Sequence, residues 1–299
     1  MASFSSQVKN ELVKIEYDKR CCKKSLLYGM ALFSKCFSAR RMTFQSENEN
    51  IIILYKKLLK ELCNIDCDVT VSPSGRSFTV DIKDKSTAAR LFSYFAHSEH
   101  ETSLKINLSN FDCQECQNAF LAGVFLSCGT VSSPEKDYHL EFSVAFLNLT
   151  KSLMTLFAES ELSPKLVQRK GYHIIYFKDS ESIEDCLYIM GASSAMFDMM
   201  NIKIVKEIRN AANRKANCET ANIEKTVNAA SPQIAAIMKI QKKKGLDSLP
   251  PNLCEMAVIR LENPDLSLSE LALMFNPPIS RSGANHRLQR LIKIADELD

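Results

Sequence analysis

Two stretches of the chain share one pattern and decide its fold: residues 120–131 read FLAGVFLSCGTV, and residues 26–37 read LLYGMALFSKCF. Both are apolar and rich in small residues, which favours helices that pack closely. Each carries a glycine near its middle, at Gly29 and Gly123. The two stretches therefore predict an internal repeat, and the sequence after each stretch supports this.

The same order of elements follows both stretches. In the first copy we expect a helix over Ser25–Phe37, a strand over Arg41–Gln45, a helix over Ile51–Cys63, a hairpin of Asp68–Ser72 and Ser77–Ile82, and a helix over Thr87–Phe95. In the second we expect a helix over Asn118–Val131, a strand over His139–Phe146, a helix over Thr150–Glu159, a hairpin of Lys165–Arg169 and Tyr172–Phe177, and a helix over Ser182–Ile189. Two copies of one mixed α/β unit, near residues 20–97 and 114–190, predict a duplicated domain over residues 1–190.

The strand pattern then ends, and residues 191–249 are expected to form a helical arm and linker. Met196–Asn213 and Ala221–Gln241 have helical character, and Asp247–Pro251 reads as the linker. The polar and partly basic stretch Asn210–Ala230 is either a solvated spacer or a second surface for phosphates or a partner helix.

Residues 250–299 contain three helical segments separated by clear breaks. The expected helices are Asn252–Leu261, Leu268–Phe275 and a third from Ser280 to about Asp296. Ser267 and Glu270 have the spacing of a capping box, and Asn276-Pro277-Pro278 cannot continue a helix. Two short helices, a tight break and a longer polar helix are the layout of a helix-turn-helix domain.

The third of these helices has one apolar face and one polar face. Ala284, Leu288, Leu291 and Ala295 recur at helical spacing and should pack on Leu271, Ala272 and Phe275. The side chains expected to contact DNA are Arg281, Ser282, Asn285, His286, Gln289, Arg290 and Lys293. Asn and Gln can pair with adenine and Arg with guanine, while Lys and Ser suit phosphates. The alternative is a solvated helix on a small bundle.

Composition limits the classes of protein. Apolar residues make up 45% and charged residues 24% of the 299 residues, which is ordinary for a soluble protein of two domains. The apolar runs are far shorter than a membrane span, and Met1–Asn10 lacks a secretory signal, so we expect the cytosol and no membrane association. Residues 200–299 hold 15 Lys and Arg against 11 Asp and Glu, and the first 199 hold 23 against 24. Affinity for phosphates should therefore lie in the C-terminal third.

The stretch Leu121–Gly129 resembles the LAGLIDADG motif of homing endonucleases, and Leu27–Lys35 resembles a more degenerate copy. In that family the two motif helices pack at a pseudo-dyad, and each ends in an acidic residue that holds catalytic magnesium. The matching positions here are Ser34 and Cys128, and neither supplies the anionic oxygen that magnesium requires. The resemblance implies an α+β fold in which a duplicated LAGLIDADG homing-endonuclease-like domain has lost its chemistry.

Over essentially its full length the chain resembles the WhiA family of sporulation transcription regulators. The similar stretches are SFSSQVKNEL, FLAGVFLSCGTVSSPEKDYHLEF, NRKANCETANIEKTVNAA and SLSELALMFNPPISRSGANHRLQRL. The resemblance implies a bacterial nucleoid-associated regulator, linked to sporulation in filamentous species and to division or chromosome segregation in others. It also implies that the all-α tail is the family's helix-turn-helix domain, with Arg281, Ser282, Asn285, His286 and Arg290 as DNA contacts.

A homing endonuclease lays a polar sheet face on DNA, and the corresponding face here is not basic. Its expected members are Arg41, Thr43, Gln45, Asp68, Thr70, Ser72, Thr79, Asp81, Lys83, His139, Glu141 and Ser143. A surface that binds DNA normally has an excess of positive charge. We therefore expect this sheet face to be a scaffold or a protein-docking surface.

The eleven cysteines read as reduced thiols, since a cytosolic protein rarely holds disulfides. Cys21 and Cys22 precede the first motif helix, and Cys113 and Cys116 precede the second. A pseudo-dyad could bring the four together, and four thiolates would suit zinc. Adjacent cysteines are a poor chelating pair, however, and buried free cysteine is a common core residue. The sequence predicts no metal and no cofactor, and leaves the role of this group open.

No nucleophile elbow, Walker loop or HExxH motif occurs, so no catalytic residue is predicted. The chain is expected to be a sequence-specific, double-stranded-DNA-binding transcriptional regulator, cytoplasmic and nucleoid-associated. Its internal pseudo-dyad is consistent with a monomer. Two alternatives stay open: a scaffold whose tail contacts RNA polymerase, a sigma factor or another regulator, and a DNA endonuclease with unusual metal ligands.

Overall fold

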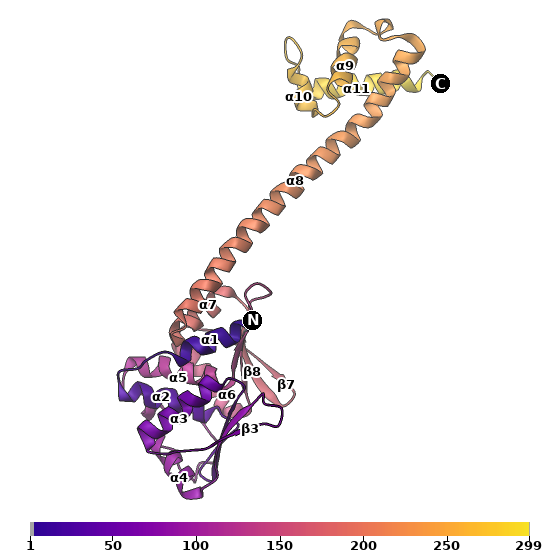
Figure 1. Ribbon diagram of the computed structural model, residues 1–299. Helices are drawn as coiled ribbons and strands as arrows, with labels where there is room; N and C mark the ends of the chain where they lie inside the picture. The colour runs from indigo at the N-terminus through magenta and orange to yellow at the C-terminus, as the bar shows by residue number, and fades with distance from the viewer. Residues whose placement is uncertain (1–2, 299) are drawn as a thin grey trace. The chain divides into compact units, whose positions relative to one another are not determined.

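The computed structural model describes residues 3–298 of the chain. It divides into two compact units, Met1–Val205 and Lys206–Asp299. Figure 1 shows helices and sheets in the first unit and helices alone in the second. The predicted α+β fold class with an all-α tail is therefore confirmed.

Within its described residues the first unit contains seven complete α-helices and eight strands, together with the start of a further helix at Ser193. The helices are α1 (Phe4–Val13), α2 (Arg20–Leu32), α3 (Glu49–Cys63), α4 (Lys85–Tyr94), α5 (Gln114–Cys128), α6 (Leu147–Glu159) and α7 (Ser180–Met190), with a short 3₁₀ helix η1 (Leu108–Asn110). The strands are β1 (Cys36–Ser38), β2 (Arg41–Ser46), β3 (Val69–Val71), β4 (Phe78–Ile82), β5 (Gly129–Val131), β6 (Leu140–Val144), β7 (Lys165–Arg169) and β8 (Tyr172–Phe177).

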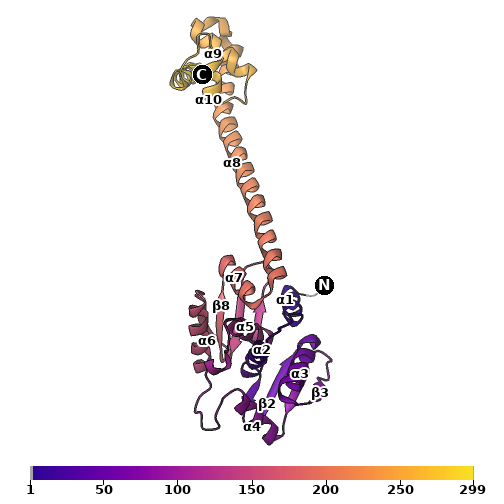
Figure 2. The same ribbon diagram turned by 90° about the vertical axis from the view of Figure 1, so that its left-hand side faces the viewer.

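The strands form two antiparallel sheets with the same topology. Their orders are β1-β2-β4-β3 and β5-β6-β8-β7. Because the second sheet repeats the order of the first, the first unit is a duplication of one α/β motif, as the repeated sequence predicts. Figure 2 shows α2 and α5 between the two sheets.

The two motif helices touch through their backbones at Gly29 and Gly123. A Cβ atom at Gly29 would lie 2.3 Å from the carbonyl oxygen of Phe120, and one at Gly123 would lie 2.2 Å from that of Leu26. Real Cβ atoms do not approach so closely, so only glycine allows this helix spacing. The apolar side chains around this contact are buried and form the core that joins the two copies.

Most predicted elements are present, with corrections at their ends. β7 and β8 have the predicted bounds, whereas the motif helices end earlier than predicted, at Leu32 and Cys128. The residues after each motif helix form the strands β1 and β5, which the sequence did not reveal because three residues are too few to show alternation. The first helix, α1, was also not predicted.

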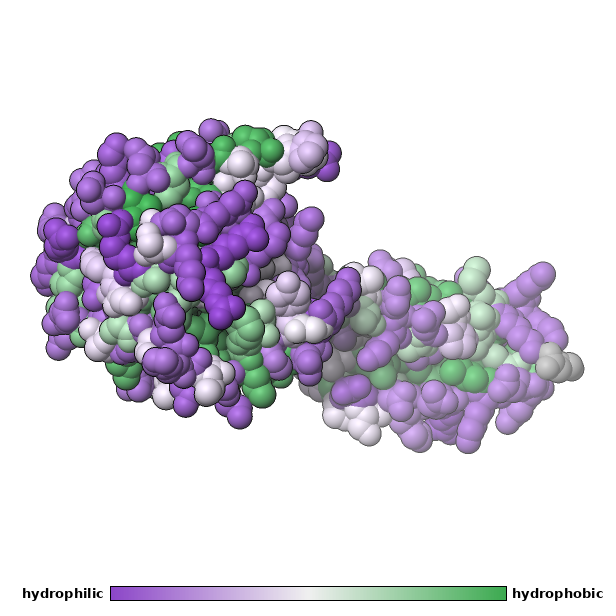
Figure 3. All heavy atoms as spheres, turned by 90° about the horizontal axis from the view of Figure 1, so that it is seen from below, coloured by the Kyte–Doolittle hydropathy of each residue, from purple (hydrophilic) through white to green (hydrophobic). Residues whose placement is uncertain are grey.

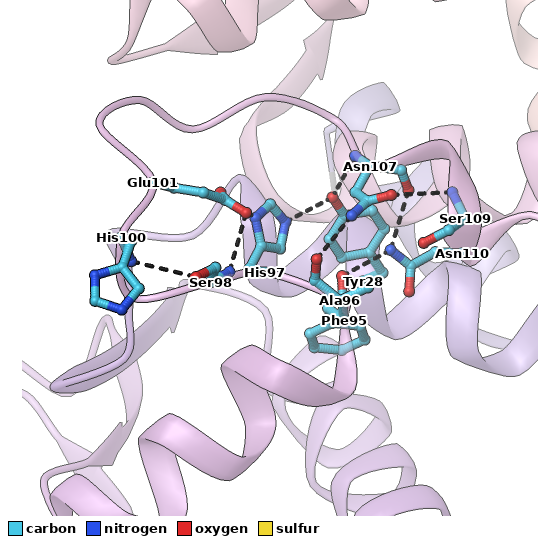
Figure 4. Close-up of polar contacts among 10 residues, drawn as sticks. All are labelled: Tyr28, Phe95, Ala96, His97, Ser98, His100, Glu101, Asn107, Ser109 and Asn110. Atoms are coloured by element: carbon cyan, nitrogen blue, oxygen red, sulfur yellow. Dashed lines mark hydrogen bonds and ion pairs between the residues drawn. The ribbon is translucent and has the colours of Figure 1, made fainter.

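A buried polar network fastens the connection between the two copies to α2. The Tyr28 hydroxyl lies 2.9 Å from Nε2 of His97, whose Nδ1 lies 2.8 Å from Glu101, and the Asn107 backbone N–H donates to the same hydroxyl (Figure 4). The Asn110 amide donates to the backbone carbonyl of Phe95. Tyr28, His97 and Asn110 are buried and hydrogen-bonded, so the network has a structural role and His97 is a satisfied core histidine.

Residues of the predicted arm form a single helix, α8 (Ser193–Lys244). The sequence predicts two helices, Met196–Asn213 and Ala221–Gln241. The predicted break between them is wrong, because one helix spans both segments. The intervening residues contain neither glycine nor proline, so nothing there ends a helix, and Pro232 lies within it. Gly245, with a positive φ of 75°, follows its last residue.

The second unit completes a small helical core. Its remaining elements are the 3₁₀ helix η2 (Leu246–Ser248), α9 (Pro251–Glu262), α10 (Leu268–Leu273) and α11 (Arg281–Asp296). The core also takes in Ala236, Ile237 and Ile240 from the end of α8. The C-terminal helices therefore pack on α8 as well as on one another.

Polar side chains dominate the visible face of the first unit, with smaller apolar patches among them (Figure 3). In the described part of the chain, no helix has both the length and the apolar character needed to span a bilayer.

Candidate nucleic-acid interface

The helix-turn-helix is built from α10, a tight break and α11. The Ser267 side chain accepts from the Glu270 N–H and the Glu270 side chain accepts from the Ser267 N–H, which is the predicted capping box. After the break, the Ser280 hydroxyl accepts from the Gly283 N–H at 3.1 Å and starts α11. Each helix of the motif thus begins at a serine whose side chain satisfies a free backbone N–H.

The apolar face of α11 packs as predicted. Ala284, Leu288, Leu291 and Ala295 are buried in one cluster with Leu271, Ala272 and Phe275. Arg287 lies beside this contact, with its guanidinium 4.8 Å from the centre of the Phe275 ring. This cation–π contact joins α11 to the turn that follows α10, and it accounts for the one arginine of α11 that the sequence did not assign to DNA.

The structure places the seven predicted DNA-contacting residues on one exposed face. Arg281, Ser282, Asn285, His286, Gln289, Arg290 and Lys293 are all exposed. Because successive residues of a helix are rotated by about 100°, Ser282, Gln289 and Lys293 form the middle of this face. Arg281 and Arg290 lie at its two edges. Such a face offers amide groups near its centre and guanidinium groups at its sides.

None of these seven side chains forms a hydrogen bond or ion pair with another residue in the range 3–298. Their donors and acceptors are therefore free for an external partner. The side chains of Asn and Gln can form two hydrogen bonds with one adenine, and that of Arg can form two with a guanine or a phosphate. The arrangement is chemically suited to the major groove of DNA.

The polar sheet face of the first unit differs because its charges pair with one another. Arg41 forms an ion pair of 2.6 Å with Asp81, and Lys83 lies 3.9 Å from the same carboxylate. His139 lies 2.9 Å from Glu141. The Arg41 guanidinium, with a smaller opposing effect of burial, holds the pKa of Asp81 below its usual value. This face offers few uncompensated cations to phosphates.

The positions that hold magnesium in homing endonucleases carry a hydroxyl and a thiol. The Ser34 hydroxyl donates to the backbone carbonyl of Cys36 at 3.1 Å. Burial raises the pKa of the Cys128 thiol to about 12, although Lys9 opposes the shift. Lys9 and Ser34 line the same groove, together with serines of α1. A hydroxyl, a neutral thiol and an ammonium are poor partners for a hard divalent cation.

The four cysteines that the sequence leaves open do come together. The Sγ atoms of Cys21, Cys22, Cys113 and Cys116 all lie within 4.8 Å of one another, where the N-terminal ends of α2 and α5 meet. Sequence spacing alone shows only the Cys113-x-x-Cys116 half of this group.

Comparison with known proteins gives matches in both units. Residues 117–209 match the WhiA LAGLIDADG-like domain, and residues 212–295 match the WhiA C-terminal HTH domain. The "Probable cell division protein WhiA" of Clostridium botulinum is 38% identical over 310 aligned positions, which cover 99% of this chain and 98% of that protein. The protein of the same name from Alkaliphilus metalliredigens is 37% identical and covers 98% of both.

Solved structures give the same result. The crystal structure of full-length WhiA from Thermatoga maritima superposes with a TM-score of 0.60 at 25% identity and covers 99% of each chain. The N-terminal LAGLIDADG domain of WhiA superposes with a TM-score of 0.50 at 20% identity, over 64% of this chain and 94% of that one, and supports the fold of the first unit. The identities over nearly the whole length of the chain and the family matches in both units show that the chain belongs to the WhiA family.

Proposed function

We propose that this WhiA-family chain is a sequence-specific DNA-binding transcriptional regulator that acts by binding and not by catalysis. The observation that carries the proposal is the exposed, unpaired polar face of α11 on a helix-turn-helix. Helices in this position of the motif enter the major groove and read base edges with their N-terminal half. The name of its relatives, probable cell division protein, supports a role in cell division. A link to chromosome segregation or to sporulation is part of the proposal.

In this proposal the parts of the chain have different tasks. Residues 250–299 read the DNA, residues 191–249 form the arm, and residues 1–190 act as a scaffold that positions the protein or recruits RNA polymerase, a sigma factor or another regulator. A monomer suffices because the first unit contains its own pseudo-dyad. The place of action would be the cytoplasm, at the nucleoid, because that is where its DNA lies.

The first prediction concerns base reading by α11. The double variant Asn285→Ala/Gln289→Ala should bind the preferred duplex at least roughly 10-fold more weakly, because each base pair read by a bidentate amide contributes about 1–3 kcal/mol of discrimination. The preferred duplex is first selected from random sequences with the unchanged full-length chain, and affinity is then measured by fluorescence anisotropy across a salt series.

The control is Gln241→Ala/Asn252→Ala, which removes the same two groups from exposed positions of the second unit outside α11. It should bind like the unchanged chain. Equal affinity of both double variants would contradict the assignment of α11. A complete absence of salt-dependent DNA binding by the unchanged chain would favour the protein scaffold instead, since phosphate contacts always weaken with salt.

The second prediction is that the chain does not cut DNA. Ser34 and Cys128 offer no carboxylate to magnesium, so duplex incubated with the full-length protein and magnesium should run intact on a denaturing gel. A control with Ser34→Ala/Cys128→Ala distinguishes cleavage by the chain itself from cleavage by a contaminating nuclease. Cleavage that the unchanged chain performs and this variant does not would make the protein an endonuclease with unusual ligands.

A further inference from the structure

Four cysteine side chains meet where the N-terminal ends of the two motif helices lie together. The Sγ atom of Cys113 is 3.7 Å from that of Cys21, 3.5 Å from that of Cys22 and 3.5 Å from that of Cys116. All four are free thiols. Across residues 3–298, no other set of three or more His, Cys, Asp or Glu side chains is close enough to share a metal ion.

The separations fit one tetrahedral zinc ion. Zinc binds thiolate sulfur at about 2.3 Å in a tetrahedron, so the sulfur atoms of a four-thiolate site are roughly 3.8 Å apart. Three separations are already 3.5–3.7 Å, and the others do not exceed 4.8 Å. The group is too compact for a four-iron cluster, in which each cysteine binds a different iron. Thiolates are also poor ligands for magnesium or calcium.

All four cysteines lie at the N-terminal ends of two helices. Cys113 is the N-cap of α5 and Cys116 lies in its first turn, while Cys21 and Cys22 lie in the first turn of α2. Free N–H groups and the helix dipole favour negative charge at such positions. The Cys113 side chain accepts no capping hydrogen bond, so its sulfur is available.

Tertiary structure also removes the objection that adjacent cysteines chelate poorly. Neighbouring side chains on a helix point about 100° apart, so Cys21 and Cys22 cannot form a site by themselves. Cys113 and Cys116 have the C-x₂-C spacing of structural zinc sites, and Cys113 lies within 3.7 Å of both cysteines of the first copy. The second copy supplies the chelating pair and the first copy supplies the remaining two ligands.

The surroundings are suited to a closed, anionic centre. Cys22 and Cys116 are buried, whereas Cys21 and Cys113 are half-buried and leave a side from which an ion can enter. The Lys19 ammonium pairs with Glu115 at 2.9 Å beside the cluster, and that carboxylate lies 3.9 Å from the Cys22 sulfur. Because Lys19 neutralises this carboxylate, the ion pair adds no net negative charge beside the two that zinc and four thiolates carry together.

We propose that Cys21, Cys22, Cys113 and Cys116 bind a single structural zinc ion, which joins the N-terminal ends of α2 and α5. With four protein ligands the ion has no open position and takes no part in catalysis. Its role is to tie the two copies of the repeat together at one end of the pseudo-dyad, while the Gly29–Gly123 contact fixes the spacing of the two helices along it.

The test uses the full-length chain, purified under reducing conditions and dialysed against zinc with a weak chelator. Elemental analysis should find about one zinc ion per chain, as expected for one four-thiolate site. Cobalt in its place should give a sulfur-to-cobalt charge-transfer band and the intense visible bands of a tetrahedral site. The variant Cys113→Ser/Cys116→Ser should lose both the zinc and these bands. The control Cys36→Ser/Cys67→Ser removes two half-buried thiols outside the cluster and should keep them.

Thiol alkylation of the unchanged chain keeps the test independent of variant folding. Zinc should protect Cys21 and Cys113, the two half-buried members of the cluster, as identified by mass spectrometry, and leave the exposed Cys218 reactive. A zinc chelator should abolish the protection and speed hydrogen exchange at the starts of α2 and α5 without changing α11. The proposal would be overturned if the unchanged chain held no zinc after dialysis, or if Cys113→Ser/Cys116→Ser retained zinc. It would also be overturned if the protection persisted with chelator and disappeared with reductant. The last result would show a disulfide.

Discussion

Gly123→Ala is expected to destabilise the first unit by about 3 kcal/mol or more, which is the upper range for overpacking a well-packed contact. The added Cβ would lie 2.2 Å from the Leu26 carbonyl oxygen and 3.0 Å from the Met30 nitrogen. Both atoms belong to the backbone of α2, so they cannot swing aside as a side chain would. The two motif helices must separate, which loosens the aromatic core around Tyr28 and Phe120. Alanine's better helix propensity, about 1 kcal/mol, offsets only part of this loss.

Urea unfolding followed by circular dichroism measures this effect. The matched control is Gly75→Ala in a turn, where φ is +69° and nothing lies within 4 Å of the new Cβ. That change costs only the strain of a left-handed alanine, about 1–2 kcal/mol. If Gly123→Ala were no more destabilised than Gly75→Ala, the helices would not be in the backbone contact described here.

Arg260→Ala is expected to unfold the second unit and abolish DNA binding with it. Arg260 is 1% exposed, and its guanidinium donates to the Gln233 side chain at 2.9 Å and to the Leu266 carbonyl at 2.7 Å. It also donates to the Asn263 carbonyl. Gln233 is buried, so its side-chain oxygen left without a partner costs about 1–3 kcal/mol. The loss of the two half-buried carbonyl contacts adds to this cost, and the sum is a large part of the stability of a small domain.

Arg260 joins α8, α9 and the turn before α10, so α11 loses its support although no residue predicted to contact DNA is changed. Arg209→Ala serves as the control, because Arg209 is an exposed arginine of α8. Thermal unfolding and anisotropy on the preferred duplex are measured for both. A melting curve and a DNA affinity for Arg260→Ala that match those of Arg209→Ala would contradict this role.

Local rules were sufficient wherever a segment carries its own signals. Ser267, Glu270 and Ser280 are capping residues whose hydrogen bonds lie within their own helix, so the starts of α10 and α11 could be predicted. The apolar spacing of α11 fixed which side is buried, and hence which seven side chains are exposed. Strands β7 and β8 also follow from alternation and the turn between them.

The errors have equally local causes. The break predicted in α8 came from a polar stretch without an apolar stripe, but polarity does not end a helix when no glycine or proline is present. Strands β1 and β5 are three residues long and are defined by their pairing with β2 and β6. A strand of this length exists because a partner offers hydrogen bonds, and a single segment of sequence cannot show that partner.

By itself, then, the sequence determined the duplication, the helix-turn-helix and the face that α11 presents, because periodicity, caps and prolines act over a few neighbouring residues. Only the tertiary structure decided that Arg260 is a buried link between three elements and that the polar sheet face neutralises its own charges. It alone also brings Cys21 and Cys22 to Cys113 and Cys116. These contacts join residues far apart in the chain. The distances among the four cysteines depend on how closely α2 and α5 pack. The two glycines allow this close packing, but no local sequence pattern gives the spacing of the two helices.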